Sequence, residues 1–188
     1  MTEQAELMQM IQKRDPKALR LLFETYFSKL SAISLRYAKN NIQAEQLFHF
    51  ALSHCYKAIQ EHRHQKQLDL NAFIEKEFIE AGIQFIKSIR NEYYVSSTVY
   101  AIETVPNTYN LFDNNEWVDL NQVDTQILIQ SLQQLVPSQR LIFNLHIIDG
   151  KSLNDAATIM ESSVETVKSN LEKARYHLQK NIEKNLKG

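Results

Sequence analysis

The sequence predicts an all-α protein, and three observations indicate this fold class. The 188 residues include only three glycines and three prolines, so strong helix breakers are few. Apolar residues recur at intervals of three and four along most of the chain, as on the buried face of a helix, and alternating strand-like runs are rare. Because 44% of the residues are hydrophobic, the chain has enough apolar material to bury one or two cores.

The N-terminal part of the chain, residues 1–91, is expected to form a helical bundle. A short helix around Leu7 to Ile11 comes first, and Asp15-Pro16 then provides a cap and a first-turn proline for the next helix. Asn40-Asn41 separates that helix from the one that follows. Three apolar stripes mark the longer helices: Leu19, Leu22, Phe23, Tyr26, Phe27, Leu30 and Ile33; Ala44, Leu47, Phe48, Ala51, Leu52, Cys55, Tyr56 and Ile59; and Phe73, Ile74, Phe78, Ala81, Phe85, Ile86 and Ile89.

The C-terminal part, residues 124–188, contains a run of short helices from residue 137 onward. Pro137 followed by Ser138 is typical of a helix start, and Asp149 with Gly150 is typical of a helix end. Between these signals, the apolar stripe consists of Leu141, Ile142, Leu145 and Ile148.

Two further helices follow at helix-turn-helix spacing. Ser152 is expected to cap the first of them together with Asp155, and Ser163 to cap the second. The polar residues 161–163 form the break between them, where Glu161 would need a left-handed backbone at some energetic cost. The apolar faces consist of Leu153, Ala156, Ala157 and Met160 in the first helix, and of Val167, Leu171, Ala174 and Leu178 in the second.

The second helix of this pair has the side chains of a DNA-recognition helix. In a helix-turn-helix, residues near the start of the second helix contact base edges, while hydroxyl, amide and basic groups hold phosphates. We therefore expect Thr166, Lys168, Ser169 and Asn170 nearest the bases, with Arg140, Lys173 and Arg175 available to phosphates or to a protein partner.

Residues 92–123 are expected to form an acidic linker between the two helical parts, because helical periodicity is lost and lysine and arginine are absent. The net charge of the whole chain is only −1, and residues 101–137 hold five acidic and no basic residues. Both flanking parts are weakly positive. Tight DNA binding by the chain alone is therefore not expected, whereas docking through a larger partner would relieve this requirement.

The C-terminal stretch resembles region 4 of the sigma-70 family of bacterial RNA polymerase sigma factors, of the extracytoplasmic-function type. The family pattern is similar to LPxxxRxVFxLxxxxGxSxxEIAxxLGxSxxTVKxxLxxARxxL. This chain departs from it with Asp155-Ala156 at the Glu-Ile pair and Glu161-Ser162 in the turn. The matching positions are Leu135, Pro137, Arg140, Phe143, Leu145, Gly150, Ser152, Ala157, Met160, Ser163, Thr166, Val167, Lys168, Leu171, Ala174, Arg175 and Leu178.

The N-terminal bundle resembles sigma region 2, on Ala18, Leu22, Tyr26, Leu30, Arg36, Tyr37, Ala44, Glu45 and Leu47. The resemblance implies that the helix containing residues 44–59 binds core RNA polymerase, through Glu45, Gln46, His49 and Leu52. The next helix would melt promoter DNA, but Phe73-Ile74 replace Trp-Leu there. Glu75, Glu77 and Glu80 are more simply interpreted as a solvated acidic face, leaving Lys87 or Arg90 as the only basic groups at the end of that helix.

The sequence argues against several other classes of function. The single Cys55 excludes an internal disulfide, and His54, His62 and His64 lack partners at metal-ligand spacing, so no metal and no cofactor are expected. Phosphate-binding glycine loops and nucleophile motifs are absent, which argues against an enzyme. Without an apolar run of membrane-spanning length or a leader-like start, the chain is expected to be cytoplasmic.

These observations predict a sigma factor that directs core RNA polymerase to promoters, with the helix-turn-helix reading the upstream (−35) element. The expected partners are core RNA polymerase, promoter DNA and, from the resemblance, an anti-sigma factor. One alternative is a divergent DNA-binding regulator that cannot melt promoters, motivated by Gln46 and the acidic helix around Glu77. Another is a helical protein-interaction module, motivated by the modest basic charge.

Overall fold

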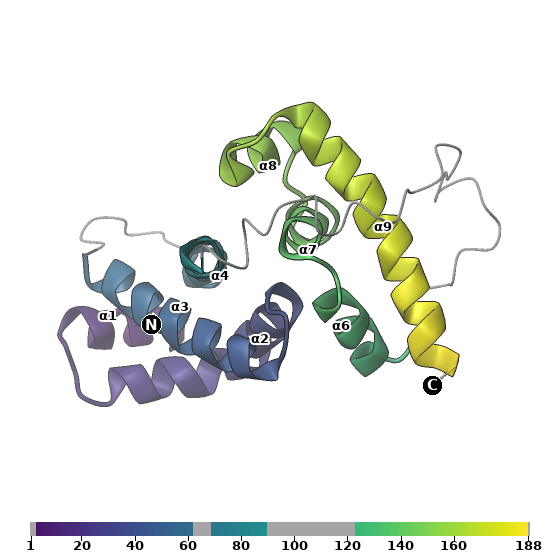
Figure 1. Cartoon of the computed structure of the whole chain (residues 1–188). Coiled ribbons are helices and arrows are strands. Elements are labelled where there is room, and N and C mark those ends of the chain that lie inside the picture. The colour runs from purple at the N-terminus through teal and green to yellow at the C-terminus, as the bar shows by residue number, and fades with distance from the viewer. Residues whose placement is uncertain (1–2, 62–68, 90–122, 188) are drawn as a thin grey trace. The chain divides into compact units, whose positions relative to one another are not determined.

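A computed structural model describes residues 3–61, 69–89 and 123–187, and all regular structure in these ranges is helical (Figure 1). The chain divides into two compact units, Met1–Ser88 and Ile89–Gly188. The predicted all-α fold is confirmed. The predicted linker 92–123 lies outside the described residues except for Val123, so its boundaries remain a prediction.

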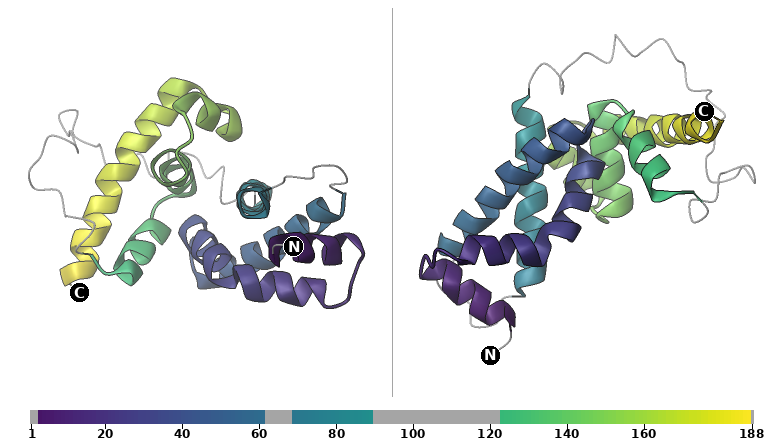
Figure 2. Two further views of the ribbon diagram at one scale, coloured as in Figure 1. Left: turned by 180° about the vertical axis from the view of Figure 1, so that it is seen from behind. Right: turned by 90° about the horizontal axis from the view of Figure 1, so that it is seen from below.

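The N-terminal unit is a bundle of the helices α1 (Glu3–Gln12), α2 (Ala18–Tyr37), α3 (Asn41–Glu61) and α4 (Leu70–Ser88) (Figure 2). Polar side chains start two of them: Asn40 Oδ1 accepts the N–H of Gln43, and Asp69 Oδ1 accepts the N–H of Asn71. The fully buried side chains of this core include Ile11, Leu22, Leu30, Tyr37, Leu47, Ile59, Leu70, Ile74 and Phe78.

The apolar stripe predicted for α2 is wider than the face that the helix buries. Leu22, Tyr26 and Leu30 are buried, whereas Leu19 and Phe27 are 47% and 48% exposed. Phe27 still contacts the edge of the α3 side chain Phe48, with ring centroids 5.6 Å apart. Side chains at positions i, i+4 and i+8 form a row that runs obliquely around the helix. The seven residues of the predicted stripe therefore cover too wide a face for all of them to be buried against one neighbouring helix.

The C-terminal unit is built around one long helix. Its elements are α6 (Thr125–Gln133), α7 (Pro137–Ile142), the π-helical turn η2 (Phe143–Ile148), α8 (Leu153–Met160) and α9 (Val164–Lys187). The buried face of α9 contacts each of the other elements, and its apolar side chains follow the predicted stripe and extend it by one turn to Ile182. The unit thus presents the opposite face of α9 to solvent.

Helix α6 was not predicted, and it holds the distal half of α9 in place. Asp124 caps α6 by accepting the N–H of Gln126 at 2.7 Å. Ser131 on α6 is fully buried, and Asn181 and Asn185 on α9 donate to its carbonyl oxygen and hydroxyl at 3.1 and 2.9 Å. These buried polar contacts fix the register of α6 on α9.

Candidate nucleic-acid interface

The turn between α8 and α9 is a Schellman motif with a non-glycine residue in the left-handed position. Glu161 has φ 53° and ψ 45°. Its N–H donates to Thr158 O at 3.2 Å, and the N–H of Ser162 donates to Ala157 O at 3.0 Å. The expected left-handed turn is therefore confirmed, and the chain makes it with glutamate at the position where glycine is least strained.

Serine side chains start both helices of the pair, as predicted. Ser152 Oγ accepts the N–H of Asp155 at 3.1 Å and donates to its carboxylate at 2.6 Å. Ser163 Oγ accepts the N–H of Thr166 at 3.1 Å, and the two hydroxyl groups are also 3.1 Å apart. Each cap satisfies an N–H that has no partner within its own helix, so the start of α9 is fixed where a recognition helix begins.

The helix before this pair starts at Pro137 as expected, but its second half is a π-helix. Asn144 is fully buried, and its Nδ2 donates to Arg140 O, the acceptor that its own N–H would use in a regular α-helix. The widened turn closes with the N–H of Asp149 donating to Asn144 O at 2.8 Å. Gly150 follows at φ 68°, which confirms the predicted end of the helix.

The structure corrects the prediction that Arg140 is available to phosphates. The residue is only 3% exposed, and its Nη1 donates to the carbonyl oxygens of Gln133 and Leu135 at 2.9 and 2.8 Å. A guanidinium held in this way joins the end of α6 to the start of α7. Arg140 is therefore a structural residue of the C-terminal unit and not part of the candidate interface.

The first exposed turns of α9 carry the residues predicted to lie nearest the bases. Thr166, Lys168 and Ser169 are exposed, and Asn170 is partly exposed. A helix turns by about 100° per residue, so Lys168 and Asn170, two residues apart, lie on opposite flanks with Ser169 between them. Helix α9 can thus present three different polar groups to the floor and the two sides of a groove.

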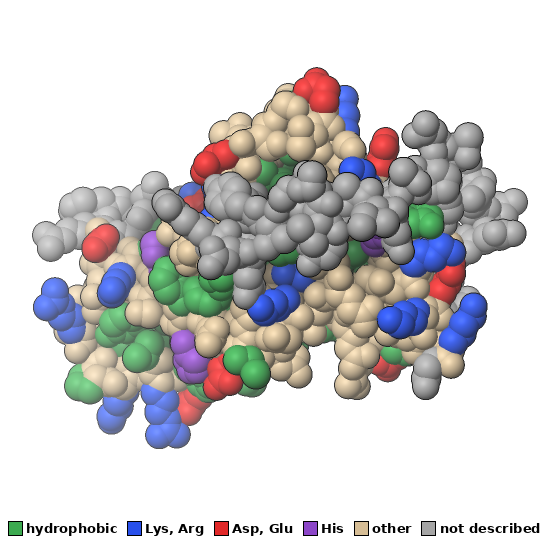
Figure 3. Space-filling model, viewed as in Figure 1, with side chains coloured by type: hydrophobic (Ala, Val, Ile, Leu, Met, Phe, Trp, Pro, Cys, Tyr) green, Lys and Arg blue, Asp and Glu red, His purple; other side chains and the backbone are tan. Residues whose placement is uncertain are grey.

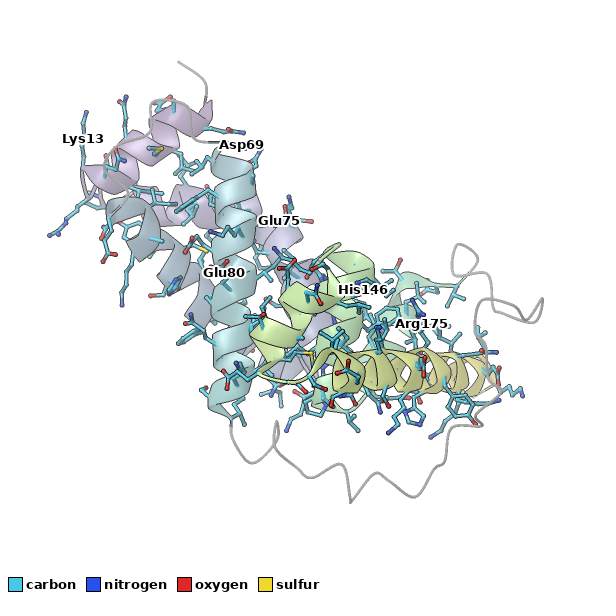
Figure 4. All side chains as sticks on the ribbon, turned by 90° about the horizontal axis from the view of Figure 1, so that it is seen from above. Lys13, Asp69, Glu75, Glu80, His146 and Arg175 are labelled. Carbon is cyan, nitrogen blue, oxygen red and sulfur yellow. The ribbon has the colours of Figure 1, made fainter. Side chains whose placement is uncertain are left out.

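The two basic residues predicted further along α9 differ in environment. Lys173 is exposed on the same side as Ser169. Arg175 is partly buried, and burial lowers the pKa of its guanidinium, while Glu172 opposes that shift. Figure 4 labels Arg175 on α9. It also labels His146 on η2, where His146 Nδ1 lies 2.7 Å from Lys151 O. Lys173 is therefore the better placed of the two predicted phosphate contacts.

The residues predicted to bind core polymerase lie on α3 and fall into two groups. Glu45, Gln46 and His49 are exposed, and His49 Nε2 is 4.0 Å from Glu45 Oε1. Leu52 is only 6% exposed and belongs to the core of the bundle, so the structure corrects its assignment as a surface contact. Ile42 is 70% exposed on the same face of α3 and was not among the predicted contacts. It lies outside the buried apolar stripe, and this position indicates an exposed apolar residue.

The acidic residues of α4 are paired within the bundle. Lys29 on α2 donates to Glu75 at 2.6 Å, His54 on α3 is 3.5 Å from Glu77, and Lys76 is 3.9 Å from Glu80. Figure 4 shows Glu75 and Glu80 on α4. The predicted solvated acidic face is thus partly a set of contacts between helices. Of the two candidate basic residues, Lys87 is partly exposed at the end of α4, and Arg90 lies outside the described residues.

Two further findings concern the described ranges. No three His, Cys, Asp or Glu side chains there come close enough to hold a metal ion; His62 and His64 lie outside those ranges. None of the helices in the described ranges is both long and apolar enough to cross a membrane.

The described helices define a helical protein of two units, whose C-terminal unit carries a capped helix-turn-helix. Residues 125–178 match the family model of sigma-70, region 4, which confirms the resemblance for this unit. The matched range begins at α6 and ends within α9. The C-terminal unit therefore contains a sigma-70 region 4 domain.

Comparison with curated proteins finds no match. Among solved structures, the chain is similar to the sigma factor RpoE of Bartonella quintana, which was crystallised in complex with the anti-sigma factor NepR. The two share 20% sequence identity with a TM-score of 0.45, over 89% of this chain and 98% of that chain.

Proposed function

We propose that the protein is a sigma factor of the extracytoplasmic-function type, acting in the cytoplasm to direct core RNA polymerase to specific promoters. The observation that carries this proposal is the coincidence of the sigma-70 region 4 match at residues 125–178 with a capped helix-turn-helix. The N-terminal bundle would bind core polymerase, and α9 would read the upstream (−35) promoter element.

In the proposed complex, the start of α9 enters the major groove. Ser169 and Asn170 offer a hydroxyl and an amide, groups that form hydrogen bonds to base edges. Lys168, on the flank opposite Asn170, would hold a phosphate on one wall of the groove, and Lys173 would hold another further along α9. Thr166 shares its hydroxyl with the Ser163 cap, so its role would be to position the helix as much as to contact DNA.

Core polymerase would bind the exposed face of α3 that contains Ile42, Glu45, Gln46 and His49. These residues follow a spacing of three, one and three, which places them on one side of the helix. An apolar side chain beside a carboxylate suits a partner that offers both an apolar contact and a basic group. The net charge of −1 also supports DNA binding that is assisted by a docked polymerase.

A second candidate function is that of a DNA-binding regulator that does not melt promoters. Glu80 is exposed on α4 and favours this second function. A carboxylate there would repel the phosphate backbone of DNA, unless its ion-pair partner Lys76 offsets the negative charge. An anti-sigma partner, by analogy with the RpoE–NepR complex, is part of the first proposal and not of the second.

Co-purification with core RNA polymerase tests the proposed function. The tagged chain should retain stoichiometric core enzyme, and Glu45→Lys should reduce the retained amount at least tenfold by reversing a charge at the contact. Glu61→Lys is the matched control, since it makes the same charge change at an exposed position near the other end of α3. Equal retention by the two variants, or no retention by the wild-type chain, would contradict the proposal.

A further inference from the structure

Helix α9 continues beyond the region 4 match as a basic stripe. The match ends at residue 178, whereas α9 runs to Lys187. This extension adds Lys180, Lys184 and Lys187, all exposed, and a shallow depression lies among them beside Glu183. Figure 3 shows blue side chains gathered around the C-terminal half of α9. In a chain of net charge −1, this local excess of positive charge runs against the average composition.

The lysines of the extension share a face with the start of the proposed recognition helix. With Ser169, Lys173 and Tyr176, they follow one another at intervals of three and four residues, so these six positions lie on one side of α9. Two acidic residues border this line: Glu172 lies three residues after Ser169, and Glu183 lies three residues after Lys180 and four before Lys187. On this side of α9, four lysines therefore outnumber two glutamates.

The basic stripe rests on a rigid support. The opposite face of the extension is buried at Ile182, and Asn181 and Asn185 donate to Ser131 on α6. The lysine ammonium groups therefore project from a helix whose register is fixed by packing and does not depend on the intrinsic helicity of a chain end.

We propose that Lys180, Lys184 and Lys187 bind the phosphate backbone of DNA next to the site that the start of α9 reads. The inference rests on the proposed function of α9. From Thr166 to Lys187 the helix rises about 30 Å, close to the length of one turn of B-DNA. Lysine ammonium groups contact phosphate oxygens, so this distal part of α9 would contact the sugar-phosphate backbone and not base edges.

An intramolecular ion pair regulates the strength of this contact. Lys180 Nζ lies 3.2 Å from Glu183 Oε2, and Glu183 also accepts from Gln179 Nε2 at 3.0 Å. Lys180 must exchange this carboxylate for a phosphate when DNA binds. Lys187 also attracts the Glu183 carboxylate, so neutralising Glu183 should strengthen phosphate binding by both of these lysines.

The salt dependence of binding to a fluorescein-labelled 30-base-pair duplex of arbitrary sequence, measured by anisotropy on the full chain, tests the proposal. Each neutralised phosphate contributes about 0.9 to the slope of log affinity against log salt concentration. The triple substitution Lys180→Gln, Lys184→Gln, Lys187→Gln should lower the slope by about 2. The triple Lys13→Gln, Lys17→Gln, Lys57→Gln removes the same charge from exposed positions of the N-terminal unit and should leave the slope unchanged.

Glu183→Gln provides a variant with the opposite expected sign. Without the carboxylate, Lys180 is available to phosphate, so both the affinity and the salt slope should rise, which a folding defect would not produce. Equal slopes for the two triple variants would overturn the proposal. The proposal would also be overturned if the triple variant of Lys180, Lys184 and Lys187 bound DNA normally but no longer retained core polymerase. That result would assign the basic stripe to a protein partner. Failure of the chain to bind core polymerase would leave this DNA measurement unaffected and contradict only the proposed function.

Discussion

Arg140 donates a hydrogen bond from Nη1 to the carbonyl oxygen of Leu135, at 2.8 Å inside the C-terminal unit. The same nitrogen reaches Gln133 O, so one buried cation joins the end of α6 to the start of α7. Arg140→Ala leaves two carbonyl groups without this donor and should lower the free energy of unfolding by about 2 to 4 kcal/mol.

Urea unfolding followed by circular dichroism measures this loss. Arg20→Ala is the control, because Arg20 is an exposed arginine in an i,i+4 pair with Glu24 and should cost less than about 0.5 kcal/mol. If both variants lost the same small amount, the structural role of Arg140 would be wrong.

Glu161→Gly should stabilise the C-terminal unit. The left-handed backbone at φ 53° costs an L-residue about 1 kcal/mol more than glycine, and the greater entropy of glycine in the unfolded chain offsets part of the gain. We expect a net rise of about 0.5 kcal/mol in the free energy of unfolding, measured by thermal denaturation. Glu172→Gly, in the exposed middle of α9, should instead cost about 1 kcal/mol. A loss of stability at both positions would contradict the turn geometry.

Cys55 gives the N-terminal unit a stability that decreases at alkaline pH. Burial, with a smaller contribution from Glu77, raises the pKa of its thiol from 9.0 to about 12. Between these values the unfolded chain loses the proton while the folded chain keeps it, so unfolding becomes more favourable as pH rises, by about 1.4 kcal/mol per unit. In Cys55→Ala, the change in stability between pH 8 and pH 11 should be smaller than in the wild type. Identical pH dependence in the two proteins would show that the thiol ionises in the folded state.

Lys168 and Asn170 should have different effects on DNA recognition, because they lie on opposite flanks of α9. Lys168→Ala should weaken binding to all sequences and lower the salt slope by about 1, the signature of one lost phosphate contact. Asn170→Ala should leave the slope unchanged and alter the sequences enriched from a randomised duplex pool, in the presence of core polymerase. Unchanged affinity and slope for Lys168→Ala would refute the assignment of α9 as the recognition helix.

Most of the fold follows from local signals in the sequence. Pro137, Ser152, Ser163 and Gly150 mark helix ends by the chemistry of single residues, and each marks an end in the structure. Helix α6 was not predicted, because its apolar stripe is short. Asp124 as a cap and the spacing of Leu128, Leu132 and Leu135 were the signals in the sequence that indicate this helix.

The candidate site was predictable only in part, because burial depends on packing between elements. Arg140 and Leu52 occupy positions that the family pattern relates to function, yet neighbouring helices cover both side chains. The π-helical turn after α7 likewise depends on where the side chain of Asn144 finds an acceptor. The exposed residues of α9 were predictable, because the cap locates the start of the helix and the apolar stripe identifies its buried face. The remaining positions then face solvent.

Run-off transcription with purified core RNA polymerase shows whether the protein acts as a sigma factor. Core enzyme and the wild-type chain, supplied with genomic DNA fragments, should yield transcripts that begin at discrete sites sharing an upstream element. The Lys168→Ala variant should reduce them while retaining core binding. Binding of DNA without any discrete transcript would contradict sigma activity and assign the protein to regulators that do not open promoters.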